Sequence, residues 1–85
     1  MSGCGMRELD KSFGEALRKR RQQLGLSQEE LNFRSGVHRT FISEIERGLK
    51  SPTFQTMISL AEALDMKLSD LIRIAEEYEA KASLT

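Results

Sequence analysis

Apolar residues recur at intervals of three and four along most of the chain, and no stretch alternates strictly between apolar and polar residues. Such intervals place apolar side chains on one face of a helix, whereas alternation is typical of a strand. The sequence therefore predicts an all-α protein with five helices. They begin near residues 12, 28, 39, 54 and 68, and the first three end at Gly25, Gly36 and Gly48.

The predicted helix starts carry residues that cap helices well. Ser27 and Glu30 have the spacing of a capping box, in which each side chain accepts a hydrogen bond from the other residue's backbone N–H. His38 and Thr53 occupy the N-cap positions of the third and fourth helices, and Gly36 suits the left-handed residue that ends the second. Short loops and a single proline then favour a compact bundle.

The length of 85 residues is enough for one domain with a modest hydrophobic core. We expect residues 12–80 to form this domain, residues 1–11 to be a flexible N-terminal segment and residues 81–85 to be a tail. The lone cysteine, Cys4, lies between glycines and has no second cysteine for an internal disulfide. Its position is more typical of an unreactive thiol than of a redox or metal site.

Charge is unevenly distributed along the chain, although the formal net charge is zero. Residues 18–51 contain eight Lys and Arg residues against four Asp and Glu residues, whereas residues 52–85 contain three against six. One part of the molecule is therefore basic and another is acidic, which is compatible with one surface that faces an anion. The zero net charge is thus no objection to a nucleic-acid partner.

The segment from Leu26 to Gly48 joins two short predicted helices by a turn that contains Gly36. The second of these helices begins with polar and basic side chains, and apolar residues follow them. The major groove of DNA admits a helix, and side chains near the entering end of that helix reach base edges. The arrangement is what a helix that reads DNA requires.

Motifs across roughly residues 13–72 resemble the Cro/CI-type helix-turn-helix domain, also called the XRE family. These motifs are LGLSQEEL, Gly36-Val37, RTFISEIERG and SPTFQTMISLAEAL, in this order. The resemblance implies a compact five-helix, lambda-repressor-like domain that binds double-stranded DNA. In size and layout the chain also resembles the controller proteins of restriction-modification systems.

The resemblance implies roles for the residues that match the family's functional positions. Those implied to contact bases are His38, Arg39, Thr40, Ser43 and Glu44. Those implied to contact DNA phosphates are Ser27, Gln28, Arg47, Lys50 and Thr53. Arg21 and Glu46 match an ion pair that ties the first helix to the end of the third.

Several of these side chains also have a purely structural interpretation, as solvated helix residues or as plain caps. They are Gln28, His38, Arg39, Thr40 and Ser43. For Glu44 a role in base specificity and a structural role are equally favoured, because a carboxylate accepts a hydrogen bond from cytosine N4 but is repelled by phosphates. The basic run from Arg18 to Arg21 is more typical of a solvated face than of a DNA contact.

Four residues depart from the family pattern. Asn32 stands where Ala is usual, Phe33 where a polar residue is usual, and His38 where Ser or Thr caps the helix. Asp65 replaces the usual Gly after the fourth helix, so we expect that turn to be strained or differently shaped. Phe33 is either a lid over the basic residues of the first helix or a contact surface.

A homodimer is expected because one small domain contacts only about one half of a palindromic site. Ile74 and Tyr78 lie at one edge of the apolar face of the fifth helix, within an otherwise acidic segment. There a second copy could cover them. The alternative is that both side chains close the core of the monomer.

The sequence predicts no enzyme, because it has one histidine, no metal-ligand spacing, no phosphate-binding glycine loop and no nucleophile motif. No cofactor, no metal and no membrane contact are expected, and the chain is predicted to be cytoplasmic. The predicted function is a sequence-specific DNA-binding transcriptional regulator, a repressor or autoregulator, that binds a palindromic operator as a homodimer. The alternative is an antitoxin-like module that neutralises a second protein partner and binds DNA secondarily.

Overall fold

A computed structural model describes the backbone of residues 2–84 and the side chains of residues 9–81. The described residues form five α-helices, which confirms the predicted all-α fold. They are α1 Ser2–Gln23, α2 Gln28–Ser35, α3 Arg39–Glu46, α4 Phe54–Ala63 and α5 Leu68–Leu84.

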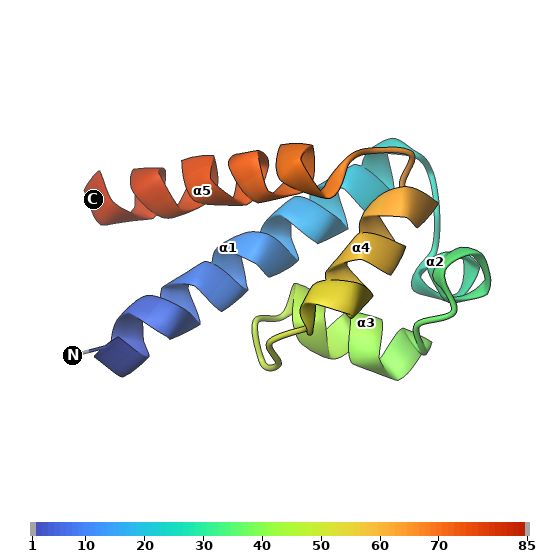
Figure 1. Cartoon of the computed structure of the whole chain (residues 1–85), viewed down its shortest axis with the longest axis horizontal. Coiled ribbons are helices and arrows are strands. Elements are labelled where there is room, and N and C mark those ends of the chain that lie inside the picture. Colours follow the sequence, from blue (N-terminus) through green and yellow to red (C-terminus); the bar gives the residue numbers. More distant parts are fainter. Residues whose placement is uncertain (1, 85) are drawn as a thin grey trace.

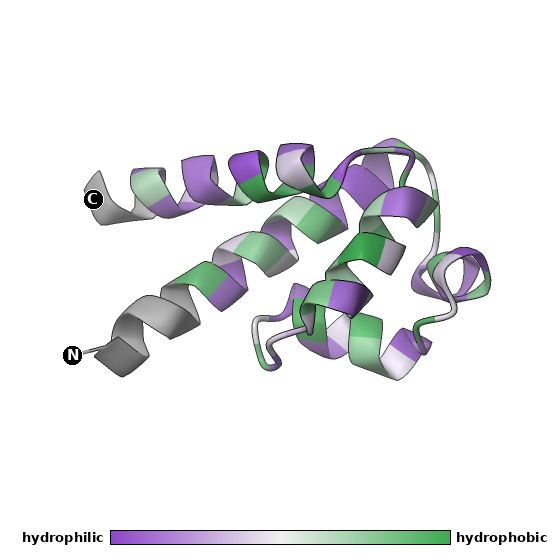
Figure 2. Ribbon diagram, viewed as in Figure 1, coloured by the Kyte–Doolittle hydropathy of each residue, from purple (hydrophilic) through white to green (hydrophobic). Residues whose placement is uncertain are grey.

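The two long helices lie side by side and run in opposite directions, so both ends of the chain are at the same end of the molecule (Figure 1). The three short helices pack at the other end, where α3 contacts α1 and α2, and α4 contacts α2 and α5. In Figure 2 the apolar segments of the helices turn toward one another, while the outward side of α5 is polar. The two long helices, α1 and α5, are the framework that positions α2 and α3.

Every helix contributes to one hydrophobic core. Its largest fully buried side chains are Leu17, Leu31, Ile42, Ile45, Leu60, Leu64 and Leu71. These are residues of the three- and four-residue intervals seen in the sequence, and each such side chain contributes about 1.5–3 kcal/mol through burial. The helix-turn-helix segment is therefore anchored from behind by Leu31 of α2 and by Ile42 and Ile45 of α3.

The start of α1 differs from the prediction, because the helix begins at Ser2 and not near residue 12. The apolar intervals of the sequence become sparse before Phe13, which is why they gave the later start. The helix continues beside α5, with which α1 makes its most extensive contacts. That residues 1–11 lie outside the domain as a flexible segment stays a prediction, and the side chain of Cys4 lies outside the described residues.

Gly14 allows α1 to approach the end of α3 closely. A Cβ atom at this position would lie 2.2 Å from the carbonyl oxygen of Ile45 and 2.8 Å from that of Glu46. Since these are backbone atoms, no side-chain rearrangement could relieve the contact. The glycine thus fixes how closely α3 is held against the framework.

The turn after α4 has the strained geometry that the sequence predicted. Asp65 has a φ of 58°, and it is the one residue other than glycine with positive φ in the described part of the chain. This left-handed conformation disfavours residues that have a Cβ atom, although Asp tolerates it better than most. The backbone N–H of Asp65 donates to the carbonyl of Glu62 at 3.0 Å, and that of Met66 donates to Ala61 at 3.0 Å.

Candidate nucleic-acid interface

The first half of the candidate interface is α2, whose two ends match the prediction. The Ser27 side chain accepts a hydrogen bond from the N–H of Glu30 at 3.0 Å, and the Glu30 carboxylate accepts one from the N–H of Ser27 at 2.8 Å. Gly36 ends the helix with φ 79° and ψ 2°, and its N–H donates to the carbonyl of Asn32 at 2.8 Å. The Ser35 hydroxyl then accepts from the N–H of Val37 at 3.0 Å, which orders the turn.

The second half is α3, which begins at a histidine cap. Nδ1 of His38 accepts a hydrogen bond from the N–H of Thr40 at 3.1 Å, so the imidazole caps α3 as a Ser or Thr side chain would. The ring therefore carries its proton on Nε2, which is left as a donor toward solvent. Because Ile42 and Ile45 are fully buried, the opposite side of α3 is the side that faces outward.

The residues expected to contact bases lie together at this outward side. His38, Arg39 and Thr40 are exposed, and Ser43 and Glu44 are half-buried. The exposed group is at the N-terminal end of α3, which is the end that enters a major groove. Their contact with DNA stays a prediction, but their placement is what it requires.

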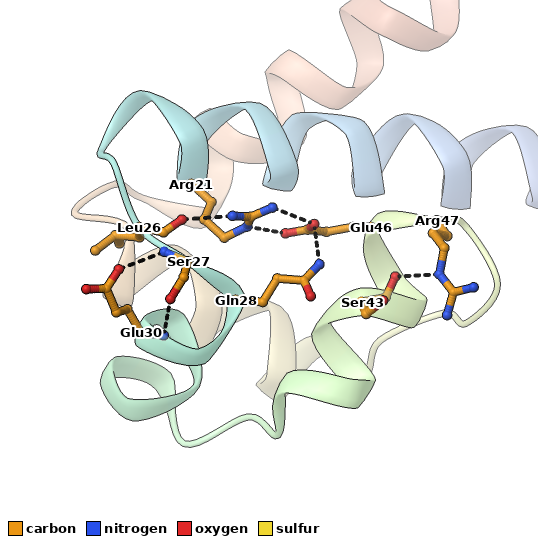
Figure 3. A network of polar contacts seen from close by, with 8 residues as sticks. All are labelled: Arg21, Leu26, Ser27, Gln28, Glu30, Ser43, Glu46 and Arg47. Carbon is orange, nitrogen blue, oxygen red and sulfur yellow. Dashed lines mark hydrogen bonds and ion pairs between the residues drawn. The ribbon is translucent and has the colours of Figure 1, made fainter.

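A buried ion pair connects the framework to the C-terminal end of α3 (Figure 3). Nε and Nη2 of Arg21 donate to the two carboxylate oxygens of Glu46 at 2.7 and 3.0 Å. The side chains of Arg21 and Glu46 are only 12% and 3% exposed. The ion pair implied by the family resemblance is therefore present, and a third bond from Arg21 to the carbonyl of Leu26 adds the loop before α2 to it.

Gln28 belongs to the same network. Its amide nitrogen donates to Glu46 Oε1 at 3.0 Å, which ties the first residue of α2 to the last residue of α3. The amide nitrogen has a second hydrogen, and the amide oxygen remains as an acceptor. The geometry supplies the contact with α3 that the resemblance implies for Gln28, while its contact with a phosphate stays a prediction.

The other residues expected to contact phosphates are exposed and lie before α2 or after α3 in the chain. Arg47 follows α3, and its Nε donates back to the carbonyl of Ser43 at 3.4 Å. Lys50 is exposed in the following loop, and Thr53 caps α4 by accepting from the N–H of Thr56 at 3.1 Å. Ser27, Arg47, Lys50 and Thr53 are all exposed, so each can be reached by a polyanion.

The basic run of α1 separates into different roles. Lys19 pairs with Glu15 at 4.0 Å and lies 5.7 Å from the centre of the Tyr78 ring, while Arg21 is in the buried ion pair. Nε of Arg20 donates to the carbonyl of Leu64 at 3.2 Å. Only Arg18, which is exposed, fits the predicted solvated face without qualification.

Two arginines meet at the C-terminal end of α4, which sequence reasoning missed. Arg20 binds the carbonyl of Leu64, and Arg34 of α2 donates to the carbonyl of Ala63 at 3.5 Å. Positive charge at this end of a helix is favourable. The spacing along the chain holds no signal for it, because α1, α2 and α4 come together only in the folded molecule.

The remaining predicted residues are Phe33 on α2 and two residues on α5. Phe33 is 79% exposed on α2, and its role, as a lid over the basic residues of α1 or as a contact surface, stays a prediction. Ile74 and Tyr78 of α5 are half-buried and pack against the core, with Lys19 over the tyrosine ring. Each keeps some exposed surface, and whether a second copy covers it stays a prediction.

Within the described residues, no three His, Cys, Asp or Glu side chains are grouped as a metal site would need. Among the helices described, none has both the length and the apolar character that crossing a bilayer requires.

Comparison with known proteins finds a family match that includes α2 and α3. The model of the helix-turn-helix family HTH_3 matches residues 17–78. The chain is 34% identical over 70 residues to y4dJ of Sinorhizobium fredii, an uncharacterized HTH-type transcriptional regulator, with 82% of this chain and 91% of that protein covered.

Two solved structures have the same fold. The clp gene regulator ClgR from Corynebacterium glutamicum superposes with a TM-score of 0.86 at 30% identity, covering 89% of this chain and 81% of that chain. The restriction-modification controller protein C.AhdI from Aeromonas hydrophila gives 0.71 at 39% identity, covering 73% of this chain and 94% of that chain.

Proposed function

The chain belongs to the XRE-type helix-turn-helix family of DNA-binding transcriptional regulators, and from that premise we propose that it binds a palindromic operator as a homodimer, with α3 in the major groove. It represses or activates according to where that operator lies relative to a promoter. It acts in the cytoplasm and controls its own gene.

The observation that carries the proposal is the contrast between the two sides of α3. On one side Ile42 and Ile45 are fully buried, and Glu46 is tied to α1 and α2. On the other side His38, Arg39 and Thr40 are exposed at the N-terminal end. A helix held so firmly from behind has a backbone that needs no further ordering, which favours binding because less conformational entropy is lost.

Base and phosphate contacts divide between α3 and its surroundings. The guanidinium of Arg39 suits guanine O6 and N7. Thr40, Ser43 and Glu44 have shorter side chains and would contact bases from further along α3. The second amide hydrogen of Gln28 and the cations of Arg47 and Lys50 would bind phosphates on either side. Such phosphate contacts fix the register of the domain on the duplex, and the base contacts choose the sequence.

A second copy is needed to read a palindrome, whose half-sites lie about 34 Å apart. The surroundings of α5 support such a copy. A cavity of about 350 Å³ there is lined mainly by apolar side chains from α1, α4 and α5, among them Leu9, Met57 and Ile72. Leu9 is 49% exposed, and Ile74 and Tyr78 add half-buried surface on the same helix pair.

The proposal is tested by a mobility shift with DNA from upstream of the coding region, across a salt series. Arg39→Ala should relax the preference at one base pair, at a cost of about 1–3 kcal/mol. Lys50→Ala should weaken binding to all duplexes similarly and reduce the salt dependence by about one phosphate contact.

The docking mode is wrong if Arg39→Ala and Gln28→Ala both leave operator affinity unchanged. Recovery of a partner protein in fixed stoichiometry, together with no preference for any duplex, would instead support the antitoxin-like alternative. Sedimentation of the free protein separately tests the homodimer.

A further inference from the structure

An ion pair links the two helices of the helix-turn-helix unit next to the proposed base contacts. Oε1 of Glu29, in the first turn of α2, lies 3.9 Å from Nη1 of Arg39, the first residue of α3. Their side chains are 60% and 61% exposed. Among the described residues it is the one ion pair that joins α2 to α3.

Glu29 lies in the first turn of α2, where a carboxylate suits the positive end of the helix dipole, but it takes no part in the hydrogen bonds that cap α2 or tie its start to α3. The capping box uses Ser27 and Glu30, and the contact with α3 on the other side uses Gln28. Placed among Ser27, Gln28 and Arg39, the Glu29 carboxylate adds a negative charge where DNA phosphates would approach. That charge by itself repels the phosphates and weakens binding to any duplex.

We propose that Glu29 is a positioning residue for Arg39, an inference that rests on the proposed function. The guanidinium has five N–H donors in a planar fork, and only one edge of the fork can lie along guanine O6 and N7. With Nη1 turned to Glu29, the opposite edge remains for the base. Glu29 thereby limits the rotamers of a long side chain that would otherwise be free on the surface.

The pair gains importance when DNA binds. In the free protein both side chains are surrounded by water, and an exposed pair of this kind contributes little to stability. Docking removes water from the space between α2, α3 and the groove, so the same attraction acts in a medium of lower dielectric constant. Glu29 therefore acts on base choice in the complex and hardly at all on the fold.

This role predicts opposite effects on specific and nonspecific binding. Glu29→Gln keeps the size of the side chain and removes its charge. The preference for guanine over the other bases at the position read by Arg39 should fall about five- to tenfold, a part of the discrimination that a bidentate contact gives. Affinity for an unrelated duplex should stay equal or rise, because a repulsion between carboxylate and phosphate is lost.

The experiment measures the dissociation constants of the full chain for the operator and for operators with one base pair changed, at a fixed salt concentration. Glu77→Gln is the matched control, because Glu77 is an exposed glutamate of α5 and the change of charge is the same. Thermal unfolding of each variant checks that the fold is kept. The double variant Glu29→Gln/Arg39→Ala completes a double-mutant cycle.

The inference holds if Glu29→Gln lowers discrimination at that base pair alone and has no such effect once Arg39 is Ala. It is overturned if discrimination is unchanged, or if it increases, which would mean that Glu29 holds Arg39 back from the base. These results differ from a failure of the proposed function. In that case the unchanged protein would show no preferred duplex, or Arg39→Ala would leave the preference intact.

Discussion

The helix-turn-helix unit, α2 and α3, and the framework pair, α1 and α5, are specified in different ways. The two short helices have eight residues each, and their ends lie at Ser27, Gly36 and His38, as local capping rules predict. The framework helices are marked less completely. Gly25, with φ 72°, follows the end of α1 as predicted, but α1 begins at Ser2 although the apolar intervals indicated residue 12. The unit that carries the proposed function is thus encoded locally, while the framework depends on contacts between distant residues.

The two regions are nevertheless coupled at a few points, and those points should dominate stability. Glu46 binds Arg21 of α1 and Gln28 of α2, and Gly14 lets α1 reach the end of α3. If the comparison is right, substitutions at these contacts cost more than the loss of a local cap.

Substitution at Glu46 should have the largest effect. Glu46→Ala leaves the guanidinium of Arg21 largely buried without its partner, and we expect a loss of about 3–5 kcal/mol in the free energy of unfolding. Denaturation by urea, followed by circular dichroism, measures it. Replacement of both partners, Arg21→Met with Glu46→Leu, should cost less than Glu46→Ala alone, since no unpaired charge is left inside. If Glu46→Ala costs no more than 1 kcal/mol, the ion pair does not couple the regions.

Gly14→Ala should come next. The added Cβ would meet the carbonyl oxygens of Ile45 and Glu46, so α1 and α3 must move apart, at a cost of about 2–3 kcal/mol. Gly25→Ala is the control, because no atom lies within 4 Å of its Cβ position and only its φ of +72° opposes the change. That control should lose about 1 kcal/mol. Equal losses at the two glycines would contradict a special role for the close approach.

The N-cap of α3 tests the local side of the comparison. His38→Ala removes the acceptor for the N–H of Thr40 and should cost about 1 kcal/mol. His38→Ser restores a cap and should recover most of that stability. Any operator affinity that the serine variant still lacks then measures what the Nε2 donor of His38 gives to DNA binding. A full recovery of affinity with serine would make His38 a plain cap.

Local contacts could be predicted from the sequence, and distant contacts could not. The ends of α2 and α3 were predictable because a capping box and an N-cap involve residues two to three positions apart. The Arg21 and Glu46 pair came only from the family resemblance, since 25 positions separate the two residues. The bonds of Arg20 and Arg34 to the end of α4 had no signal, because neighbouring residues in the sequence do not reveal which carbonyls the fold brings close. Gly14 is a signal of a different kind, because a glycine within a helix often marks a close approach of another backbone.

The smallest predicted effect concerns the turn between α4 and α5, where a local rule is broken. Asp65 holds a φ of 58°, and Gly adopts this conformation without opposition from a Cβ atom. Asp65→Gly should therefore raise the free energy of unfolding by a net amount of about 0.5–1 kcal/mol. This net gain is smaller than the strain that is relieved, because glycine also makes the unfolded chain more flexible. Thermal and urea unfolding measure the change, and Asp65→Ala should be destabilising because Ala keeps the Cβ atom and lacks the short polar side chain. A stabilising effect of Ala would mean that the backbone here is not strained, and that the framework, like the helix-turn-helix unit, obeys its local rules.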